Sequence, residues 1–258
     1  MMPLRDVEVH LWLADLQHFA APQRLAACEE LLDGAEHERA RRFAFARHQQ
    51  RLIITRGLLR SLLSLYHVNT APQEWQFSFN PHGKPALAAP ELDHALQFNL
   101  SHSGRRLVIA ISKLSLLGVD IEMIMPRQHL MAIARRHFSA DEYQALTALD
   151  GDRRIQRFYD LWTLKESYVK ACGKGLAIQL KEFSFAFPSP GQLDLQFSVQ
   201  REDDVTRWYF AQFADAESRM ALAVSRPKDN ARPRLLIRSL QDLGQFTTTT
   251  LMPAGEFP

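Results

Sequence analysis

Hydrophobic residues alternate with other residues near the start of the chain, from Val7 to Leu13. A period of two is typical of a β-strand, so this segment is predicted to be an edge or half-buried strand that opens the fold. The spacing becomes helical from Glu36 to Tyr66, where leucines recur on one face. Three hydrophobic runs that predict strands come next, at residues 96–100, 107–112 and 117–124.

The second part of the chain returns to helical spacing, first over residues 130–149. Ser139 and Glu142 form an S-x-x-E sequence inside this stretch, which predicts a capping box where one helix ends and another starts. A long amphipathic helix is expected from Phe158 to a Gly-Lys-Gly turn at residues 173–175. Four short alternating runs then predict antiparallel strands, at residues 183–187, 193–199, 208–213 and 221–225.

The order strand, long helix, Gly-Lys turn and strands thus occurs twice along the chain. It predicts an α+β fold of two related halves, an N-terminal half at residues 1–116 and a C-terminal half at residues 117–226. After Arg226 the sequence turns to R-P-K-D-N-A-R-P-R and a run of threonines. Residues 227–258 are therefore expected to form an extension that is partly ordered at best.

Composition narrows the class of protein. The 258 residues are 46% hydrophobic and 23% charged, as in an ordinary globular protein, and the formal net charge is only +2. No overall field attracts the chain to nucleic acid or to a membrane, so neither is an expected partner. The two cysteines, Cys28 and Cys172, have no metal-ligand spacing, and the charged N-terminus does not resemble a signal peptide. We expect a cytoplasmic protein.

Positive charge is nevertheless concentrated in the first predicted long helix. Against only Glu36 and Glu38, that stretch carries seven arginines: Arg39, Arg41, Arg42, Arg47, Arg51, Arg56 and Arg60. Two interpretations stay open from this segment alone. The arginines form either a local anion-binding surface or a solvated helix face.

Acidic residues supply the strongest candidate chemistry. Asp120 and Glu122 are two positions apart on a predicted strand, so their carboxylates point to the same side. Either this side is wet or a cation offsets the repulsion between them. If the helix that carries Glu166 and Lys170 packs over the strand, a third carboxylate joins the pair. An all-oxygen site of this kind suits Mg²⁺, which shares its shell with water and phosphate.

A polar loop could complete an anion site. The F-N-L-S-H-S-G sequence ends a predicted strand and offers the hydroxyl of Ser101 and the imidazole of His102, although a side-chain-stabilised turn explains it equally well. A serine hydrolase is disfavoured because the chain has no G-x-S-x-G elbow, and neither a P-loop nor the protein-kinase signatures are present.

Taken together, six motifs resemble the surfactin-type 4'-phosphopantetheinyl transferases over about residues 5 to 226. The combination of the fourth and sixth is highly specific. In chain order they are R-R-F at Phe43, H-G-K-P at 82–85, F-N-L-S-H-S-G at 98–104, G-V-D-I-E at 118–122, F-S-A-D-E-Y at 138–143 and W-T-L-K-E-S-Y-V-K-A-C-G-K-G-L at 162–176. One departure is His48-Gln49-Gln50, where the family often has an acidic residue.

The resemblance implies two pseudo-symmetric α+β halves with coenzyme A in the cleft between them. It implies an Mg²⁺-dependent enzyme that moves 4'-phosphopantetheine to a serine of an acyl or peptidyl carrier protein and releases adenosine 3',5'-bisphosphate. By the same resemblance, the metal ligands are Asp120, Glu122 and Glu166. The coenzyme contacts it implies are Lys170 to the pyrophosphate, Ser101 and His102 to phosphate, Gly83, Lys84 and Pro85 on the adenine side, and Arg47 with Arg39 to the 3'-phosphate.

The reaction requires a base and a positive environment for the leaving oxygen. Glu166 is the first candidate to accept the serine proton, directly or through a metal-bound water, and Mg²⁺, Lys170 and His102 would stabilise the leaving oxygen. Glu142 is a second candidate for the base, although a capping box explains it equally well. Lys165 is turned away from Glu166 by helical rotation.

Arg135 and Arg136 lie beside apolar Met131 and Phe138 and could form a docking edge for an acidic carrier, or ordinary helix surface. We expect a monomer. Two other classes of function remain open: an Mg²⁺-dependent enzyme acting on a free nucleotide, and a non-catalytic protein that binds coenzyme A or a carrier.

Overall fold

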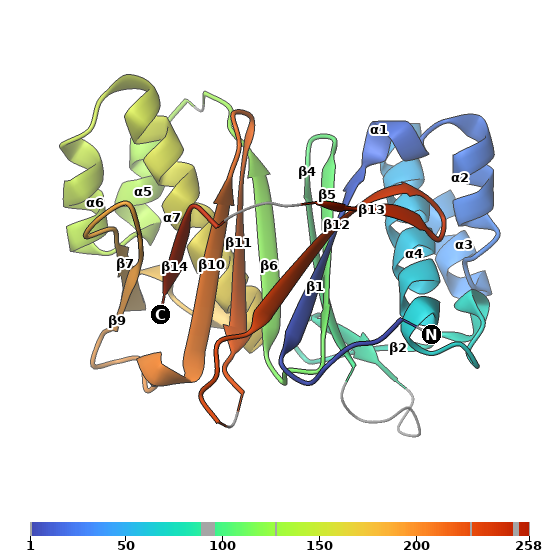
Figure 1. Ribbon diagram of the computed structural model, residues 1–258. Helices are drawn as coiled ribbons and strands as arrows, with labels where there is room; N and C mark the ends of the chain where they lie inside the picture. Colours follow the sequence, from blue (N-terminus) through green and yellow to red (C-terminus); the bar gives the residue numbers. More distant parts are fainter. Residues whose placement is uncertain (1, 89–95, 127, 228, 250–252, 258) are drawn as a thin grey trace.

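Two β-sheets stand side by side in the middle of the molecule, and helices cover the outer face of each (Figure 1). The computed structural model describes residues 2–88, 96–126, 128–227, 229–249 and 253–257. The predicted α+β fold of two similar halves is confirmed, because each half has a five-stranded sheet and one long helix.

The described residues of the N-terminal half form four α-helices, of which α4 is the longest. The sheet of this half has the order β13-β12-β1-β5-β4, in which β12 (Arg234–Asp242) and β13 (Gln245–Thr249) come from the C-terminal extension, and β2 pairs with β3 in a separate hairpin. The elements are β1 (Glu8–Asp15), α1 (Leu16–Phe19), α2 (Pro22–Glu29), α3 (Gly34–Arg41), α4 (Ala46–Tyr66), β2 (Phe77–Phe79), β3 (Pro85–Leu87), β4 (Gln97–Ser103) and β5 (Arg106–Ser112), with a short 3₁₀ turn at Pro72–Glu74.

In the C-terminal half the long helix is α7, and the sheet order is β6-β11-β10-β14-β8. The elements are β6 (Leu117–Met123), α5 (Leu130–His137), α6 (Ala140–Thr147), α7 (Gly151–Cys172), β7 (Phe183–Ala186), β8 (Gly191–Gln192), β9 (Asp194–Phe197), β10 (Trp208–Ala214) and β11 (Ser218–Ser225), with 3₁₀ turns at Gly175–Ala177, Leu180–Glu182 and Val205–Arg207. Strands β7 and β9 pair as a small separate sheet.

The C-terminal extension departs from the sequence prediction. Instead of a partly ordered appendage, it forms β12 (Arg234–Asp242), β13 (Gln245–Thr249) and β14 (Gly255–Phe257). Strand β12 pairs in parallel with β1, and β14 joins the sheet of the other half. As a result β1 is an interior strand rather than an edge. Residues 228, 250–252 and 258 of this extension lie outside the described residues.

Helix boundaries also differ from the prediction in two places. The helical stretch expected from Glu36 to Tyr66 is broken by an exposed segment at residues 42–45, which separates α3 from α4. Helix α7 begins at Gly151 and not at Phe158, and it ends as predicted before Gly173, whose φ of 67° favours glycine. The capping box is confirmed, since Ser139 and Glu142 bond each other's backbone N–H groups.

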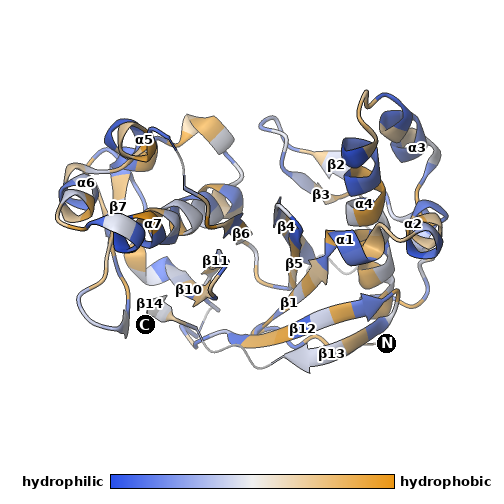
Figure 2. Cartoon of the chain, turned by 90° about the horizontal axis from the view of Figure 1, so that it is seen from above, coloured by the Kyte–Doolittle hydropathy of each residue, from blue (hydrophilic) through white to orange (hydrophobic). Residues whose placement is uncertain are grey.

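Three hydrophobic cores hold these layers together. One lies between α4 and the N-terminal sheet, around Trp12 and Leu59, and a second lies between α7 and the C-terminal sheet, around Leu164 and Phe210. A third joins the inner faces of the two sheets. Figure 2 shows the helices of the two halves on opposite flanks of this double sheet. Among the described residues, no helix is both long enough and apolar enough to cross a membrane.

Candidate active site

Strand β6 presents its acidic residues to helix α7. Val119 and Ile121 face the other sheet in the third core, so by alternation Gly118, Asp120 and Glu122 face the helix. Gly118 permits this close packing, because a Cβ there would lie 2.0 Å from the carbonyl oxygen of Ser167 and 2.3 Å from the backbone nitrogen of Ala171. The glycine of the G-V-D-I-E motif therefore sets the distance between α7 and the carboxylates.

Side chains of β4 join β6 across the boundary between the two sheets. Asn99 Oδ1 accepts a hydrogen bond from the Val119 backbone N–H at 2.9 Å. Ser101 Oγ donates to Asp120 Oδ1 at 2.8 Å, and Ser103 Oγ donates to Glu122 Oε2 at 2.6 Å. These three contacts form a ladder that aligns the F-N-L-S-H-S-G motif with the G-V-D-I-E motif, although the strands belong to different sheets.

Lys170 completes a tight polar cluster at Asp120. Its Nζ lies 2.6 Å from Asp120 Oδ1, 2.8 Å from Ser101 Oγ and 3.3 Å from the carbonyl oxygen of Val119. Asp120 is only 4% exposed, and its second oxygen, Oδ2, is buried without a hydrogen-bond partner among the described residues. Burial raises the pKa of Asp120, while the Lys170 ammonium and the Ser101 hydroxyl act in the opposite direction.

Glu166 lies one helical turn before Lys170, and the charges of both β6 carboxylates act on it. Burial raises its pKa, and the charges of Asp120 and Glu122 raise it further, against the effect of Lys170. The charges of Asp120 and Glu122 thus both act on Glu166, and the assignment of the three carboxylates as metal ligands stays a prediction. Among the described residues, however, no three His, Cys, Asp or Glu side chains are grouped closely enough to hold a metal ion as they stand.

The hairpin loop between β2 and β3 is fixed to the end of α7. Asn80 organises it, because its Oδ1 accepts hydrogen bonds from the backbone N–H groups of His82 and Lys84 and its Nδ2 donates to the Gly173 carbonyl. Lys84 Nζ donates to the carbonyl oxygens of Leu117 and Ala171 at 3.0 Å each. Burial lowers the pKa of Lys84 to about 8. Leu117 and Ala171 belong to the C-terminal half, so the Lys84 ammonium joins the hairpin loop to that half.

A cavity of about 510 Å³ opens between the halves at this point. The walls come from α4, the β2–β3 hairpin, β4 and α7, with Glu166 and Lys170 on the α7 side. His102 also lines the cavity, and burial together with the charges of Arg51 and Lys170 lowers its pKa. At neutral pH the imidazole is therefore uncharged and can accept or donate a hydrogen bond.

The arginines of α3 and α4 divide into distinct groups. Arg39, Arg51 and Arg56 line the cavity, although Arg56 also pairs with Glu36 at 3.1 Å. Arg60 is fully buried and holds Asp33, Glu36 and two backbone carbonyls, so its role is structural.

Arg47 is not among the described residues that line the cavity. It is exposed, with its guanidinium 5.2 Å from the centre of the Phe45 ring. The structure thus brings Arg39 to the cavity but not Arg47, whose assignment to a phosphate stays a prediction. Arg51, which the sequence analysis did not single out, is in the better position.

Glu142 of α6 and Lys165 of α7 are not among the described residues that line the cavity. They form a buried ion pair. Lys165 Nζ lies 2.9 Å from Glu142 Oε2, and the two side chains are 0% and 1% exposed. Lys165 also donates to the carbonyl oxygens of Leu180 and Phe183. These contacts support the capping and structural interpretation of Glu142 and disfavour it as a base.

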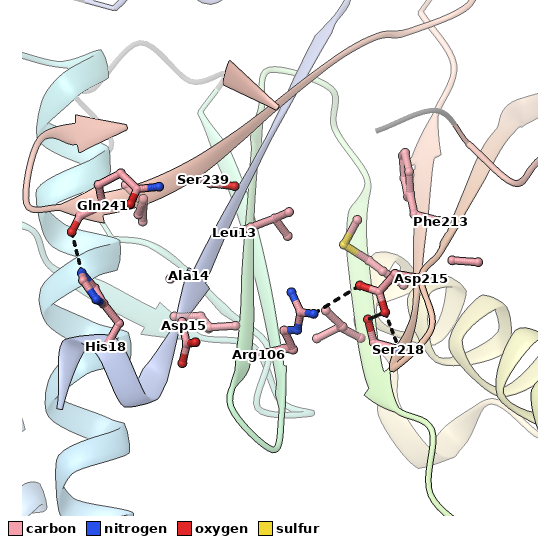
Figure 3. Close-up of a pocket in the computed structure, with 15 residues that line it drawn as sticks. Leu13, Ala14, Asp15, His18, Arg106, Phe213, Asp215, Ser218, Ser239 and Gln241 are labelled. Carbon is pink, nitrogen blue, oxygen red and sulfur yellow. Dashed lines mark hydrogen bonds and ion pairs between the residues drawn. The ribbon is translucent and has the colours of Figure 1, made fainter. Parts of the chain in front are cut away.

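A second cavity of about 330 Å³ lies on the far side of β6, where Ile121 forms part of its wall. Arg106 of β5 reaches across it to Asp215 of the β10–β11 turn at 3.3 Å (Figure 3). The remaining wall combines apolar residues with polar ones, among them Asp15, His18 and Gln241. None of the predicted site residues lines this cavity among the residues that the structure describes, so it has no part in the candidate active site.

Comparisons with known proteins agree with the motifs. One family model, described as the 4'-phosphopantetheinyl transferase superfamily, matches residues 116–225, and a second, described as 4'-phosphopantetheinyl transferase, N-terminal, matches residues 20–114. The chain is 36% identical over 196 residues to the 4'-phosphopantetheinyl transferase HetI of Nostoc sp., which covers 76% of this chain and 81% of the relative. It is 34% identical over 193 residues to the 4'-phosphopantetheinyl transferase Sfp of Bacillus subtilis, with 74% and 81% covered.

The chain belongs to the 4'-phosphopantetheinyl transferase family. A relative from Bacillus pumilus with the same name is 30% identical over 228 residues, which is 88% of each chain. The resemblance inferred from the six motifs is thereby confirmed. Both family models end before the C-terminal extension, so β12, β13 and β14 lie outside the matched regions of this transferase.

Proposed function

We propose that the protein transfers the 4'-phosphopantetheine group of coenzyme A to a serine of an apo acyl or peptidyl carrier protein. Adenosine 3',5'-bisphosphate is the second product. The family to which the chain belongs and the names of its relatives support this proposal. The expected cytoplasmic location and monomeric state belong to the same proposal.

One observation carries the assignment to this site. The cavity between the halves joins a cationic wall, with Arg39 and Arg51, to a reactive end, with Glu166 and Lys170. A ligand with phosphates along its length fits this distribution, because guanidinium groups bind phosphate oxygens in a bidentate manner and an ammonium binds them as a point charge. The adenine side of the coenzyme would lie at Gly83, Lys84 and Pro85, which also line the cavity.

The oxygen donors of the acidic residues suit a divalent ion in their chemistry, and the described side chains would have to move closer together to hold one. Asp120, Glu122 and Glu166 would hold Mg²⁺, which prefers carboxylate oxygens. Two features support this fit: the unpartnered buried Oδ2 of Asp120 and the raised pKa of Glu166 beside two other carboxylates. When bound, the ion would supply positive charge that offsets the negative charge on the phosphates of the coenzyme.

Glu166 is the proposed acceptor of the serine proton. Its carboxylate lines the cavity beside Lys170, so it is placed to accept a proton from a hydroxyl group that binds there. As the serine oxygen forms its bond to the β-phosphorus of coenzyme A, the proton passes to Glu166. The bond from that phosphorus to the bridging oxygen breaks, and Lys170 and the neutral His102 stabilise the charge on the leaving bisphosphate.

The test is the intact mass of an apo carrier protein after incubation with the protein, coenzyme A and Mg²⁺. A gain of one phosphopantetheine group per carrier is expected, and a carrier with its acceptor serine changed to alanine should gain nothing. Breakdown of the nucleotide without modification of the carrier would instead favour an enzyme acting on free nucleotide. Binding of coenzyme A without either reaction would favour a non-catalytic protein.

Single substitutions then test the site. Asp120→Ala and Glu166→Ala should abolish transfer while the circular dichroism spectrum stays unchanged. Asp152→Ala is a matched control, because Asp152 lies in the first turn of the same helix and is exposed. Near-normal turnover by either of the first two variants would remove the assignment of the carboxylates.

A further inference from the structure

Lys170 contacts one carboxylate oxygen of Asp120, Oδ1, and leaves the other, Oδ2, without a hydrogen-bond partner among the described residues. Its ammonium bonds Asp120 Oδ1, Ser101 Oγ and the Val119 carbonyl, so three oxygens surround the nitrogen within 3.3 Å. Asp120 itself is not among the described residues that line the cavity, whereas Lys170 is. The ammonium thus lies between the cavity and the carboxylate.

A second cation at Asp120 would meet strong repulsion from this ammonium. Repulsion between like charges grows with their product, so a divalent ion meets twice the repulsion that a monovalent ion would meet at the same distance. The ammonium offsets the charge of Asp120, one of the three carboxylates proposed to hold the ion. Binding of a divalent ion through Asp120 is therefore weaker while Lys170 stays there and stronger once Lys170 moves away.

The cavity offers Lys170 another partner. The Lys170 side chain is 28% exposed and lines the cavity together with Arg51 and His102. The charges of Arg51 and Lys170 make this part of the cavity positive. A phosphate bound there would attract the ammonium away from Asp120. A flexible chain of four methylene groups joins the Lys170 ammonium to α7, so the ammonium can change its partner without movement of the backbone.

We infer that Lys170 and a divalent cation compete for Asp120, so that the metal binds tightly only when a phosphate-bearing ligand has drawn Lys170 away. This inference rests on the proposed function and adds an order of binding to it: coenzyme and metal bind cooperatively, and the metal alone binds weakly. Cooperative coupling between two ligands usually amounts to about 5-fold to 150-fold in affinity.

Binding of Mn²⁺, followed by electron paramagnetic resonance, tests the inference without any measurement of activity. Saturating coenzyme A should tighten Mn²⁺ binding to the unmodified protein by at least about tenfold, after subtraction of Mn²⁺ bound by coenzyme A alone. In Lys170→Met, Mn²⁺ without coenzyme should bind about tenfold tighter than in the unmodified protein, and the tightening by coenzyme should shrink accordingly. Lys170→Gln, which keeps a hydrogen-bond donor near Asp120, should behave like Lys170→Met.

Lys174→Met is the matched control, since Lys174 is four residues further along, just past the end of α7, and is exposed and equally charged. It should leave both Mn²⁺ affinities unchanged. Equal Mn²⁺ affinity of Lys170→Met, Lys170→Gln and the unmodified protein in the absence of coenzyme would overturn the inference. Failure of carrier modification would instead count against the proposed function, because the Mn²⁺ measurement needs no carrier.

Discussion

Variants of the buried pair of Glu142 and Lys165 can distinguish an effect on the stability of the fold from an effect on the transfer rate. All three hydrogens of the Lys165 ammonium have acceptors, namely Glu142 Oε2, the Leu180 carbonyl and the Phe183 carbonyl. Glu142 also accepts hydrogen bonds from the backbone N–H groups of Ser139 and Phe185, both at 2.9 Å. Its carboxylate therefore ties the start of α6 to α7 and to β7.

Glu142→Gln removes the charge and keeps the shape. The change leaves the Lys165 ammonium buried without a counter-charge, and breaking a buried pair in this way costs about 3 to 5 kcal/mol. Typical domains have about 5 to 15 kcal/mol of stability in total, so the variant should still fold at 25 °C with a much lower midpoint. Urea unfolding with linear extrapolation measures the loss.

Asp141→Asn is the matched control, because Asp141 is the neighbouring residue in the same helix and is exposed. It should cost less than about 1 kcal/mol, as expected for one charge near a helix N-terminus. Replacement of both partners, as Glu142→Leu with Lys165→Met, should recover much of the stability, since apolar residues often replace buried pairs without loss. The transfer rate per folded molecule of Glu142→Gln should stay close to normal.

The reasoning would be refuted by one pattern of results. If Glu142→Gln unfolds at the same urea concentration as the unmodified protein but loses transfer by a factor of about 10² or more, Glu142 acts as a base. Its contacts would then have to change when substrate binds.

Two further predictions concern the N-terminal half. Burial, with a contribution from Arg238, lowers the pKa of His10 to about 4 from an unfolded value of 6.5. The unfolded state therefore binds more protons between these values, so stability should rise by roughly 3 kcal/mol from pH 4 to pH 6.5, and His10→Gln should flatten that rise in a series of unfolding curves. Deletion of residues 227–258 exposes one edge of β1 and removes the buried side chains of Ile237 and Leu240. The thermal midpoint in calorimetry should therefore fall by at least about 6 °C. An unchanged midpoint would show that β12 does not contribute to the stability of the fold.

Local patterns predicted most of the elements and the common side of the strand on which two of the candidate site residues lie. Alternation was sufficient to place Asp120 and Glu122 on one side of a strand, because side-chain direction in a strand depends only on sequence parity. The S-x-x-E sequence located the break between α5 and α6, because a capping box is formed by residues three positions apart.

The C-terminal extension was mispredicted for a physical reason. Its first residues are rich in proline and arginine, which are typical of poorly packed segments. Its order comes from pairing with β1, more than two hundred residues earlier, in the register Glu8 to Arg234. An ion pair between the same two residues at 3.2 Å supports that register. A partner so far away along the chain cannot be identified from the pattern of the segment itself.

Arg47 illustrates a different limit. A single helix from Glu36 to Tyr66 would carry one continuous face, but the break at residues 42–45 restarts the helical phase at Ala46. Counted from there, His48, Arg51 and Thr55 are spaced by three and four positions, and all three line the cavity. Arg47 is also four positions from Arg51, so spacing alone does not separate the two; they differ because Arg47 is exposed in the first turn of α4.

The position of the reactive residues depends on contacts between the halves more than on either half alone. Asp120 and Glu122 belong to the C-terminal sheet, yet the groups that orient their carboxylates, Ser101 and Ser103, come from an edge strand of the N-terminal sheet. The two sheets have no strand in common, so this side-chain ladder, the shared apolar core and the extension that contributes β12 to one sheet and β14 to the other fix their relative position. A site assembled in this way can bring a cationic wall from one half against carboxylates from the other, which neither half could provide by itself.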